Sequence, residues 1–187
     1  MMDNESARRI EILNTHLGMN RMTNITPSEI TGNVFTRLNK QWMLITSERD
    51  SEVNAMTASW GGFGVIWNMP VAYVLVRPQR YTFELMEASD RFGLSFLTEQ
   101  YRAALQVCGT KSGRELDKLK AVGLTTRRLD GIPVIEQAEL VISCKKLYSQ
   151  FLADAGFVRR ELLKIHYPGN DLHKLYIGEI TAVEIER

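Results

Sequence analysis

Asn54-Ala55-Met56-Thr57-Ala58-Ser59-Trp60-Gly61-Gly62 is the stretch of this sequence that says most about the fold. It mixes small and hydroxyl side chains and ends in paired glycines, which is unusual for a buried strand and lets a ligand approach the backbone. In a strand, Thr57 and Ser59 point to one face, and Asn54, Met56, Ala58 and Trp60 point to the other. An edge strand that ends in a tight turn would give the same pattern.

Segments rich in β-branched and aromatic residues lie on both sides of this stretch and predict a mainly β fold. We expect strands over residues 42–46, 53–60, 71–77, 92–97, 140–148, 157–165 and 175–185. Because no regular helices separate these strands, they favour an antiparallel barrel over a doubly wound sheet.

Short helices are expected in insertions between the strands. Their signals are hydroxyl side chains that cap a first turn and glycines that end a last one. The clearest signal is the capping box Ser112-Gly113-Arg114-Glu115. The expected helices follow Thr26, Thr82, Thr98 and Ser112, and the last three reach about Ala88, Val107 and Gly123.

The composition bounds the class of protein. A chain of 187 residues is long enough for one domain, or for one domain with an appendage. Hydrophobic residues at 44% and charged residues at 24% are typical of a soluble globular protein. Because 23 Lys and Arg nearly balance 22 Asp and Glu, no overall field attracts nucleic acid or an anionic membrane. We expect neither as a partner, so an anion would need a local site.

The N-terminal residues 1–24 carry a weak helical pattern and are interpreted as an arm, with the domain over residues 25–187. Cys108 and Cys144 form no Cys-x-x-Cys pair, and no signal peptide or membrane span is recognised, so a cytoplasmic location is expected. The histidines and cysteines have no metal-ligand spacing, so no metal site is expected.

Two basic segments are candidates for binding a phosphate group. Arg77-Pro78-Gln79-Arg80-Tyr81-Thr82 leaves an apolar strand and enters a helix, so two guanidinium groups would meet the free amides of a helix N-terminus. A basic surface turn paired with Glu84 or Glu87 is the alternative. Residues 110–118 offer hydroxyl groups and cations at another helix start, and a capped surface helix would give the same pattern.

Together these segments resemble the flavin reductase-like family of FMN-binding split barrels, the group that includes the flavoredoxins. The resemblance covers the chain from about Thr26 to the C-terminus and is carried, in order, by residues 42–46, 54–62, 76–82, 108–114 and 173–180. It implies an antiparallel Greek-key split barrel with a few short helices in insertions. It also implies a homodimer with FMN in a groove at the interface.

The resemblance further implies roles for individual residues. The first stretch would line the isoalloxazine ring and ribityl chain, and the basic segments would hold the phosphate. His173 would lie near the nicotinamide of an electron donor, although Leu172 separates it from Asp171 where the family has Gly-Asp-His. The implied cofactor-binding residues are Asn54, Met56, Thr57, Ala58, Ser59, Trp60, Arg77, Arg80, Tyr81, Thr82, Ser112 and Lys118.

The function that these features imply is an FMN-binding oxidoreductase that passes hydride or electrons from NAD(P)H, or from a protein donor, through FMN to an unknown acceptor. FMN would be a retained cofactor or a substrate. Hydroxyl or amide donors between Thr57 and Trp60 would stabilise negative charge on the reduced ring. A flavin-binding or ligand-sensing barrel without turnover is the alternative, and an enzyme that uses Cys108 is a third interpretation.

Overall fold

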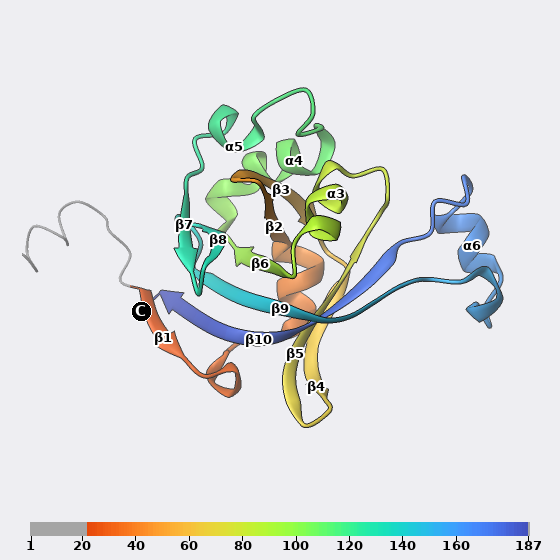
Figure 1. The fold of residues 1–187 in the computed structure, drawn as a ribbon, viewed down its shortest axis with the longest axis horizontal. Helices are drawn as coiled ribbons and strands as arrows, with labels where there is room; N and C mark the ends of the chain where they lie inside the picture. The colour runs from red at the N-terminus through yellow and green to blue at the C-terminus, as the bar shows by residue number, and fades with distance from the viewer. Residues whose placement is uncertain (1–21, 187) are drawn as a thin grey trace, which may run out of the picture.

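The computed structural model describes residues 22–186 as a curled β-sheet with short helices packed around it (Figure 1). The main sheet has the strand order β3-β2-β6-β9-β10-β5-β4; β1 pairs with β10 off this path, and β7 and β8 form a separate hairpin. All these pairs are antiparallel. The strands are β1 (Met22–Ile25), β2 (Met43–Arg49), β3 (Glu52–Ala58), β4 (Gly61–Ile66), β5 (Met69–Val76), β6 (Arg91–Phe96), β7 (Thr126–Leu129), β8 (Ile132–Ile135), β9 (Leu140–Phe151) and β10 (Lys174–Glu186).

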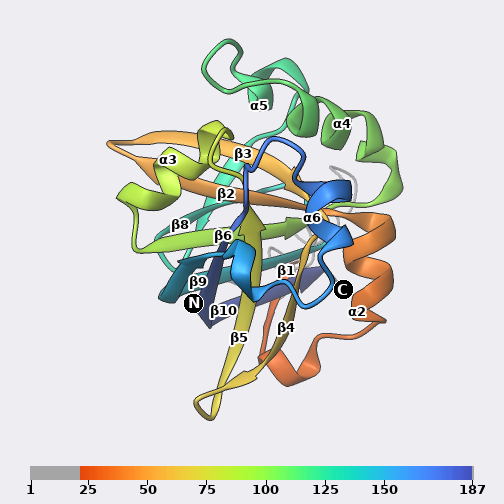
Figure 2. The same ribbon diagram turned by 90° about the vertical axis from the view of Figure 1, so that its right-hand side faces the viewer.

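The helices are short and lie outside the sheet. Figures 1 and 2 show α3, α4 and α5 together on one side of it, while α6 lies in the excursion between β9 and β10. The helices are η1 (Pro27–Glu29), α2 (Val34–Thr36), η2 (Arg37–Gln41), α3 (Tyr81–Ala88), η3 (Glu99–Tyr101), α4 (Arg102–Thr110), α5 (Lys118–Ala121), η4 (Asp154–Gly156) and α6 (Glu161–His166). Within residues 22–186, no helix is long and apolar enough to cross a membrane.

The two edges of the main sheet are consecutive in the chain. β3 ends at Ala58 and β4 begins at Gly61, so only Ser59 and Trp60 join the first and last strands of the sheet order. The sheet must therefore curl until its edges approach each other, which makes a barrel that is open at this seam. This mainly β, antiparallel split barrel is the fold that the sequence predicted.

The central strands are buried on both faces. In β2, Met43 and Ile45 belong to the cluster inside the barrel, whereas Leu44 packs in a second cluster with α4 and β8. This alternation follows the two-residue period of a strand. Cys144 is fully buried in the barrel cluster, and Cys108 is fully buried in the second one. Neither thiol reaches the surface.

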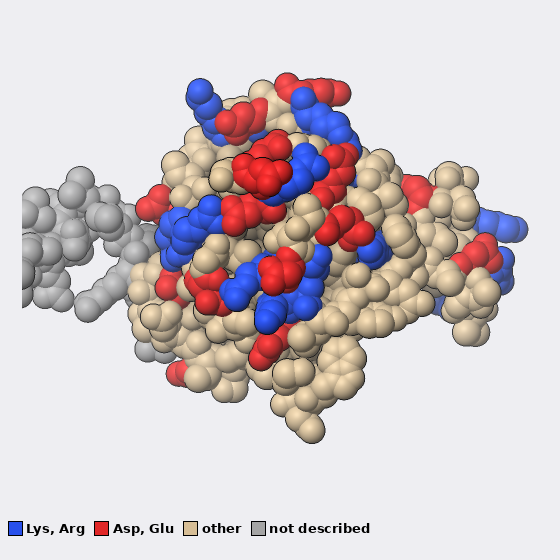
Figure 3. Space-filling model, viewed as in Figure 1, with Lys and Arg blue, Asp and Glu red and all other residues tan. Residues whose placement is uncertain are grey.

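Charges of both signs are interspersed on the face of the molecule that Figure 3 shows. This agrees with the net charge of +1. On this face, Lys and Arg lie beside Asp and Glu over the middle of the barrel, so no broad patch of one sign forms there.

The strand predictions are confirmed except over residues 157–165. These residues follow η4 and contain most of α6 instead of a strand. The apolar residues Leu162, Leu163 and Ile165 are consistent with a helical face as well as with a strand. Strand β4 was missed because its glycines lower strand propensity, and the hairpin of β7 and β8 was missed because each strand has only four residues.

The helix predictions are partly wrong. The capping box after Ser112 forms only a turn, and α5 begins at Lys118, where the Asp117 side chain accepts a hydrogen bond from the Lys120 amide at 3.1 Å. Helix α3 begins at Tyr81 with Arg80 as its N-cap, so Thr82 lies inside it. The helix of residues 34–41, which Asn33 caps, was not predicted.

The start of the chain is described only from Met22 onward, so most of the expected arm lies outside the described residues. Its last residues are part of the sheet, because Met22–Ile25 forms β1 and pairs with the end of β10. The expected boundary after residue 24 therefore cuts through a strand. The short helix expected after Thr26 is confirmed as η1, and the Thr26 amide donates to the Glu29 carboxylate at 2.8 Å.

Candidate functional site

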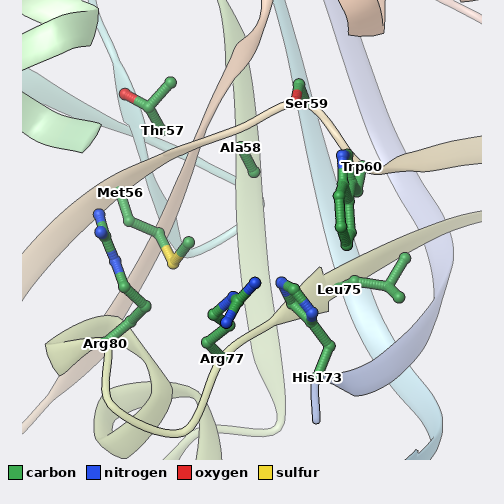
Figure 4. A pocket seen from close by; sticks show the side chains of 9 residues that line it. All are labelled: Met56, Thr57, Ala58, Ser59, Trp60, Leu75, Arg77, Arg80 and His173. Carbon is green, nitrogen blue, oxygen red and sulfur yellow. The ribbon is translucent and has the colours of Figure 1, made fainter. Parts of the chain in front are cut away.

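A cavity of about 250 Å³ opens at the seam of the barrel, where β3 turns into β4 (Figure 4). One wall is the end of β3 and the turn after it, and the other comes from the end of β5, the start of α3 and the residue before β10. The lining residues are Met56, Thr57, Ala58, Ser59, Trp60, Leu75, Arg77, Arg80 and His173.

Gly61 makes the turn at this seam. Its φ is +153°, and a Cβ at this position would lie 2.3 Å from the carbonyl oxygen of Tyr73 in β5. Because the backbone fixes the position of both the Cβ and the Tyr73 oxygen, no side-chain rotation relieves this clash. The paired glycines of the sequence therefore mark a close approach of two strands, and they position the preceding residues along the cavity.

Arg80 lines the seam cavity and forms a cationic pair with Lys118, which lines a second cavity next to it. The Arg80 guanidinium donates hydrogen bonds to the carbonyl oxygens of Gly109 at 2.6 Å and Cys108 at 3.1 Å. The Lys118 ammonium donates to the same Cys108 oxygen at 3.3 Å, and its residue is only 3% exposed. Within residues 22–186 neither cation has a carboxylate at ion-pair distance.

The pKa values of Arg80 and Lys118 are both lowered. Burial, together with the nearby Arg80 charge, lowers the pKa of Lys118 to about 8, and burial lowers the pKa of Arg80 as well. Burying a cation without an anion is costly. These two side chains therefore form a site that an anion would stabilise.

The Thr57 hydroxyl faces α4 and donates a hydrogen bond to the carbonyl oxygen of Leu105 at 2.5 Å. A hydroxyl group has only one proton to donate. In this structure that proton is directed to Leu105, and the role of the Thr57 hydroxyl toward a reduced flavin ring stays a prediction. Main-chain amides remain as donors at this wall, since β3 is an edge strand and every second residue of such a strand turns its N–H away from its partner.

Arg77 is engaged by the loop that precedes β10 and not by the cationic pair. Its guanidinium forms an ion pair with Asp171 and donates to the carbonyl oxygen of His166 at 2.8 Å. Gln79 donates to the same Asp171 carboxylate at 2.7 Å. The structure thus gives Arg77 an anchoring role, and its predicted role as a phosphate ligand stays a prediction.

His173 lies beside Arg77 because the register of β10 and β5 pairs Lys174 with Val76. Its ring packs in a tilted arrangement against the Trp60 ring, with 4.9 Å between the ring centroids, and the two side chains lie next to each other in Figure 4. Burial and the Arg77 charge lower the pKa of His173 to about 4. The imidazole is therefore neutral at physiological pH.

Asn54 and Thr82 pair with each other behind the cavity wall. The Asn54 amide donates to the Thr82 hydroxyl at 2.8 Å, and Thr82 is fully buried. Neither residue lines the seam cavity. Asn54, Tyr81 and Lys118 instead line a second cavity of about 320 Å³, which adjoins the first half of β3, and the Ser112 hydroxyl accepts a hydrogen bond from the Arg114 amide.

Comparison with known proteins assigns the chain to a family. Residues 35–187 match the model of the flavin reductase like domain. The chain belongs to this family. Within residues 22–186, no group of three or more His, Cys, Asp or Glu side chains that could hold a metal ion occurs in this flavin reductase-like domain.

Solved structures share the fold of this flavin reductase-like chain at low identity. An FMN-binding domain of a flavin reductase-like enzyme from Shewanella baltica is 16% identical, with a TM-score of 0.66 over 89% of this chain and 78% of that one. A Thermus thermophilus FMN-binding protein is 22% identical, with a TM-score of 0.63 over 87% and 83%. A flavoredoxin from Methanosarcina acetivorans is 21% identical, with a TM-score of 0.62 over 87% and 77%.

Most of the site residues predicted from the sequence of this flavin reductase-like domain line the seam cavity. The seam cavity unites residues 56–60 with Arg77, Arg80 and His173. Leu75 was missed because it is one apolar residue among many in β5, and only the pairing of β5 with β10 brings it to the cavity. Lys118 joins Arg80 through the Cys108 carbonyl oxygen, which no spacing in the sequence indicates.

Replacing Thr82 with valine tests whether this residue is structural. We expect the free energy of unfolding to fall by about 1–3 kcal/mol, because the buried Asn54 amide loses its acceptor. The ratio of FMN to riboflavin affinity should stay unchanged, since Thr82 does not line the seam cavity. Urea denaturation and flavin titration measure the two quantities. A selective loss of FMN affinity would restore Thr82 as a phosphate ligand.

Proposed function

We propose that this chain is an FMN-dependent oxidoreductase of the flavin reductase type, which passes hydride or electrons from NAD(P)H or a protein donor through FMN to an acceptor. The observation that carries the proposal is that Arg80, which lines a cavity of about 250 Å³, shares the Cys108 carbonyl oxygen with the buried Lys118. Within residues 22–186, neither cation has a carboxylate at ion-pair distance. Membership of the flavin reductase-like family supports it.

The residues around the seam fit the chemistry of FMN. The pair of Arg80 and Lys118 would receive the dianionic phosphate through charge-assisted hydrogen bonds. Met56 and Leu75 offer apolar surface for a flat ring, and Trp60 is 39% exposed beside them. Small side chains at Ala58 and Ser59 leave room for the ring to approach the main chain.

Bound FMN would supply the hydride-accepting chemistry itself. The chain would bind and orient it: Arg80 and Lys118 fix the phosphate, and the wall of residues 56–60 positions the ring. No carboxylate lines the cavity, and His173 is neutral at physiological pH. We therefore infer that hydride transfer here needs no protein acid or base.

The visible absorption spectrum of the purified, dialysed protein is the first test of this proposal. Bands of oxidised flavin at about one per chain would mean a retained cofactor, and reversible uptake of added FMN would mean that FMN is a substrate. Anaerobic addition of NADH or NADPH should then bleach the bands promptly. A colourless protein that takes up no FMN would contradict the proposal.

Flavin binding without bleaching would leave two functions to separate. A carrier should be bleached by a protein donor, whereas a flavin-binding or ligand-sensing barrel should not turn over with any donor. Cys108→Ser is the matched control for the third interpretation: because Cys108 is fully buried in the core, this change should leave any reductase activity intact.

We propose a homodimer as the assembly of this chain. Large apolar side chains are exposed at Phe35 and on the hairpin of β4 and β5, where Val65 is 75% and Trp67 is 57% exposed. Such side chains are typical of a surface that another chain covers. Sedimentation equilibrium should give twice the mass of the chain, and Val65→Asp should shift it toward the monomer; a wild-type monomer would contradict the proposal.

The affinity for FMN should depend on pH through Lys118. Since its pKa is about 8, the ammonium is charged below this pH and neutral above it. A phosphate dianion favours the charged form, so FMN affinity is complete below pH 8 and falls above it, by up to about tenfold per pH unit. Riboflavin should show no such fall. Lys118→Met should remove the dependence, and a pH-independent FMN affinity in the native protein would exclude Lys118 as a ligand.

A further inference from the structure

One ring nitrogen of His173 is engaged, and the other is open to the seam cavity. The Nδ1 atom lies 2.9 Å from the Tyr167 hydroxyl oxygen, and both residues are buried. Among residues 22–186, only Ser47 Oγ and Thr98 Oγ1 are fully enclosed side-chain polar atoms without a partner. The Nε2 atom of His173, which has no protein partner among these residues, is therefore not enclosed, and we infer that it is accessible from the seam cavity that His173 lines.

The direction of the hydrogen bond between Tyr167 and His173 follows from the protons available. If Tyr167 donates to Nδ1, its single hydroxyl proton is used and the ring proton resides on Nε2. If Nδ1 donates instead, the hydroxyl proton of a residue that is 7% exposed has no acceptor among the described residues. Since an unpaired buried donor is costly, the first arrangement is favoured.

The surroundings keep this arrangement neutral. The charged and titratable groups that face His173 are Arg77 from the end of β5, Asp171 and Tyr167 from the loop before β10, and His166 at the end of α6, which contacts Trp60. Burial raises the pKa of Tyr167, so its hydroxyl keeps its proton. Arg77 opposes a second positive charge on the imidazole.

We propose that Tyr167 is a positioning residue that holds His173 in the tautomer with the proton on Nε2, so that the seam cavity offers a neutral N–H donor beside Trp60. Such a donor suits an uncharged oxygen acceptor, a carbonyl or carboxamide group, on the molecule that binds next to the flavin. The choice of that molecule rests on the proposed function, whereas the tautomer does not.

Tyr167 comes from the excursion between β9 and β10, so this segment contributes to the site. It is held in place by the Tyr167 ring, which packs against Phe157 with 5.8 Å between centroids, and by the ion pair of Arg77 with Asp171. The Arg77 guanidinium also lies 5.3 Å from the centre of the Tyr167 ring. Arg77 thus supports Tyr167 and through it His173.

The test is nitrogen NMR of the protein with ¹⁵N-labelled histidine, in the full chain without added flavin at pH 7. The His173 signals are assigned by their loss in His173→Gln. In the native protein we expect one predominant tautomer, with a protonated Nε2 and an unprotonated Nδ1. In Tyr167→Phe the ratio of the tautomers should change by about fivefold to tenfold toward a protonated Nδ1, because one hydrogen bond is lost.

The control is Tyr148→Phe, which removes a hydroxyl from an exposed tyrosine of β9 and should leave the His173 signals unchanged. A native protein with the proton on Nδ1 overturns the proposal, even if Tyr167→Phe fails to fold. An unchanged tautomer ratio in a folded Tyr167→Phe protein also overturns it. Failure of the protein to bind FMN would contradict the proposed function alone, since the NMR measurement uses no flavin.

Discussion

Arg80→Ala should weaken FMN binding about 100-fold while changing riboflavin binding less than threefold. The guanidinium lies beside the seam cavity without a carboxylate partner, and a charge-assisted hydrogen bond to phosphate contributes about 1.5–3 kcal/mol. Riboflavin has no phosphate, so it does not sense this group. Fluorescence titration with each flavin measures both affinities.

Two further variants make the Arg80 experiment specific. Arg80→Lys keeps the charge and should recover part of the FMN affinity. Arg159→Ala removes an arginine whose side chain is 71% exposed in the excursion before α6, and should leave the FMN to riboflavin ratio unchanged. Equal losses for both flavins in Arg80→Ala would mean that Arg80 only supports α4 through Cys108 and Gly109.

Gly61→Ala should destabilise the domain by about 2–4 kcal/mol and abolish flavin binding. The added Cβ would meet the Tyr73 carbonyl oxygen at 2.3 Å, so β4 and β5 must move apart. Moving β4 also displaces Trp60 and the wall of residues 56–60. Urea denaturation gives the free energy of unfolding, and titration with FMN gives the affinity.

Gly64→Ala is the matched control in the same strand. A Cβ at Gly64 meets no atom within 4 Å. The free energy of unfolding of this variant should therefore lie within about 0.5 kcal/mol of the native value, and the variant should bind flavin normally. If both alanine variants were equally stable, the close approach at Gly61 would not constrain the seam.

The fold was largely predictable because its strands carry their own signals. The β-branched and aromatic runs of β2, β5, β6, β9 and β10 are local features of the sequence. The local sequence signals gave the wrong secondary structure where tertiary contacts outweigh the strand or helix propensity of a segment. The glycines of β4 disfavour a strand, yet β4 pairs along its full length with β5, and the Ser112 capping box forms only a turn.

The candidate site was predictable in part. Residues 56–60 lie along one strand end, so a local motif was enough to bring them to the same wall. The roles of the two arginines were not predictable, because each role depends on partners that are distant in the sequence. Arg77 and Arg80 are three positions apart and alike in sequence, but Arg77 binds Asp171 from the loop before β10, whereas Arg80 binds the carbonyl oxygens of Cys108 and Gly109.

The sequence by itself determined that this chain forms an antiparallel barrel with a ligand-accessible corner after β3, because strand propensity and paired glycines act locally. The tertiary structure alone decided which charged groups remain free for an anion. Curling of the sheet and packing of α4 and of the loop before β10 bring distant atoms within hydrogen-bond reach, and so engage Arg77 with a carboxylate while leaving Arg80 and Lys118 without one.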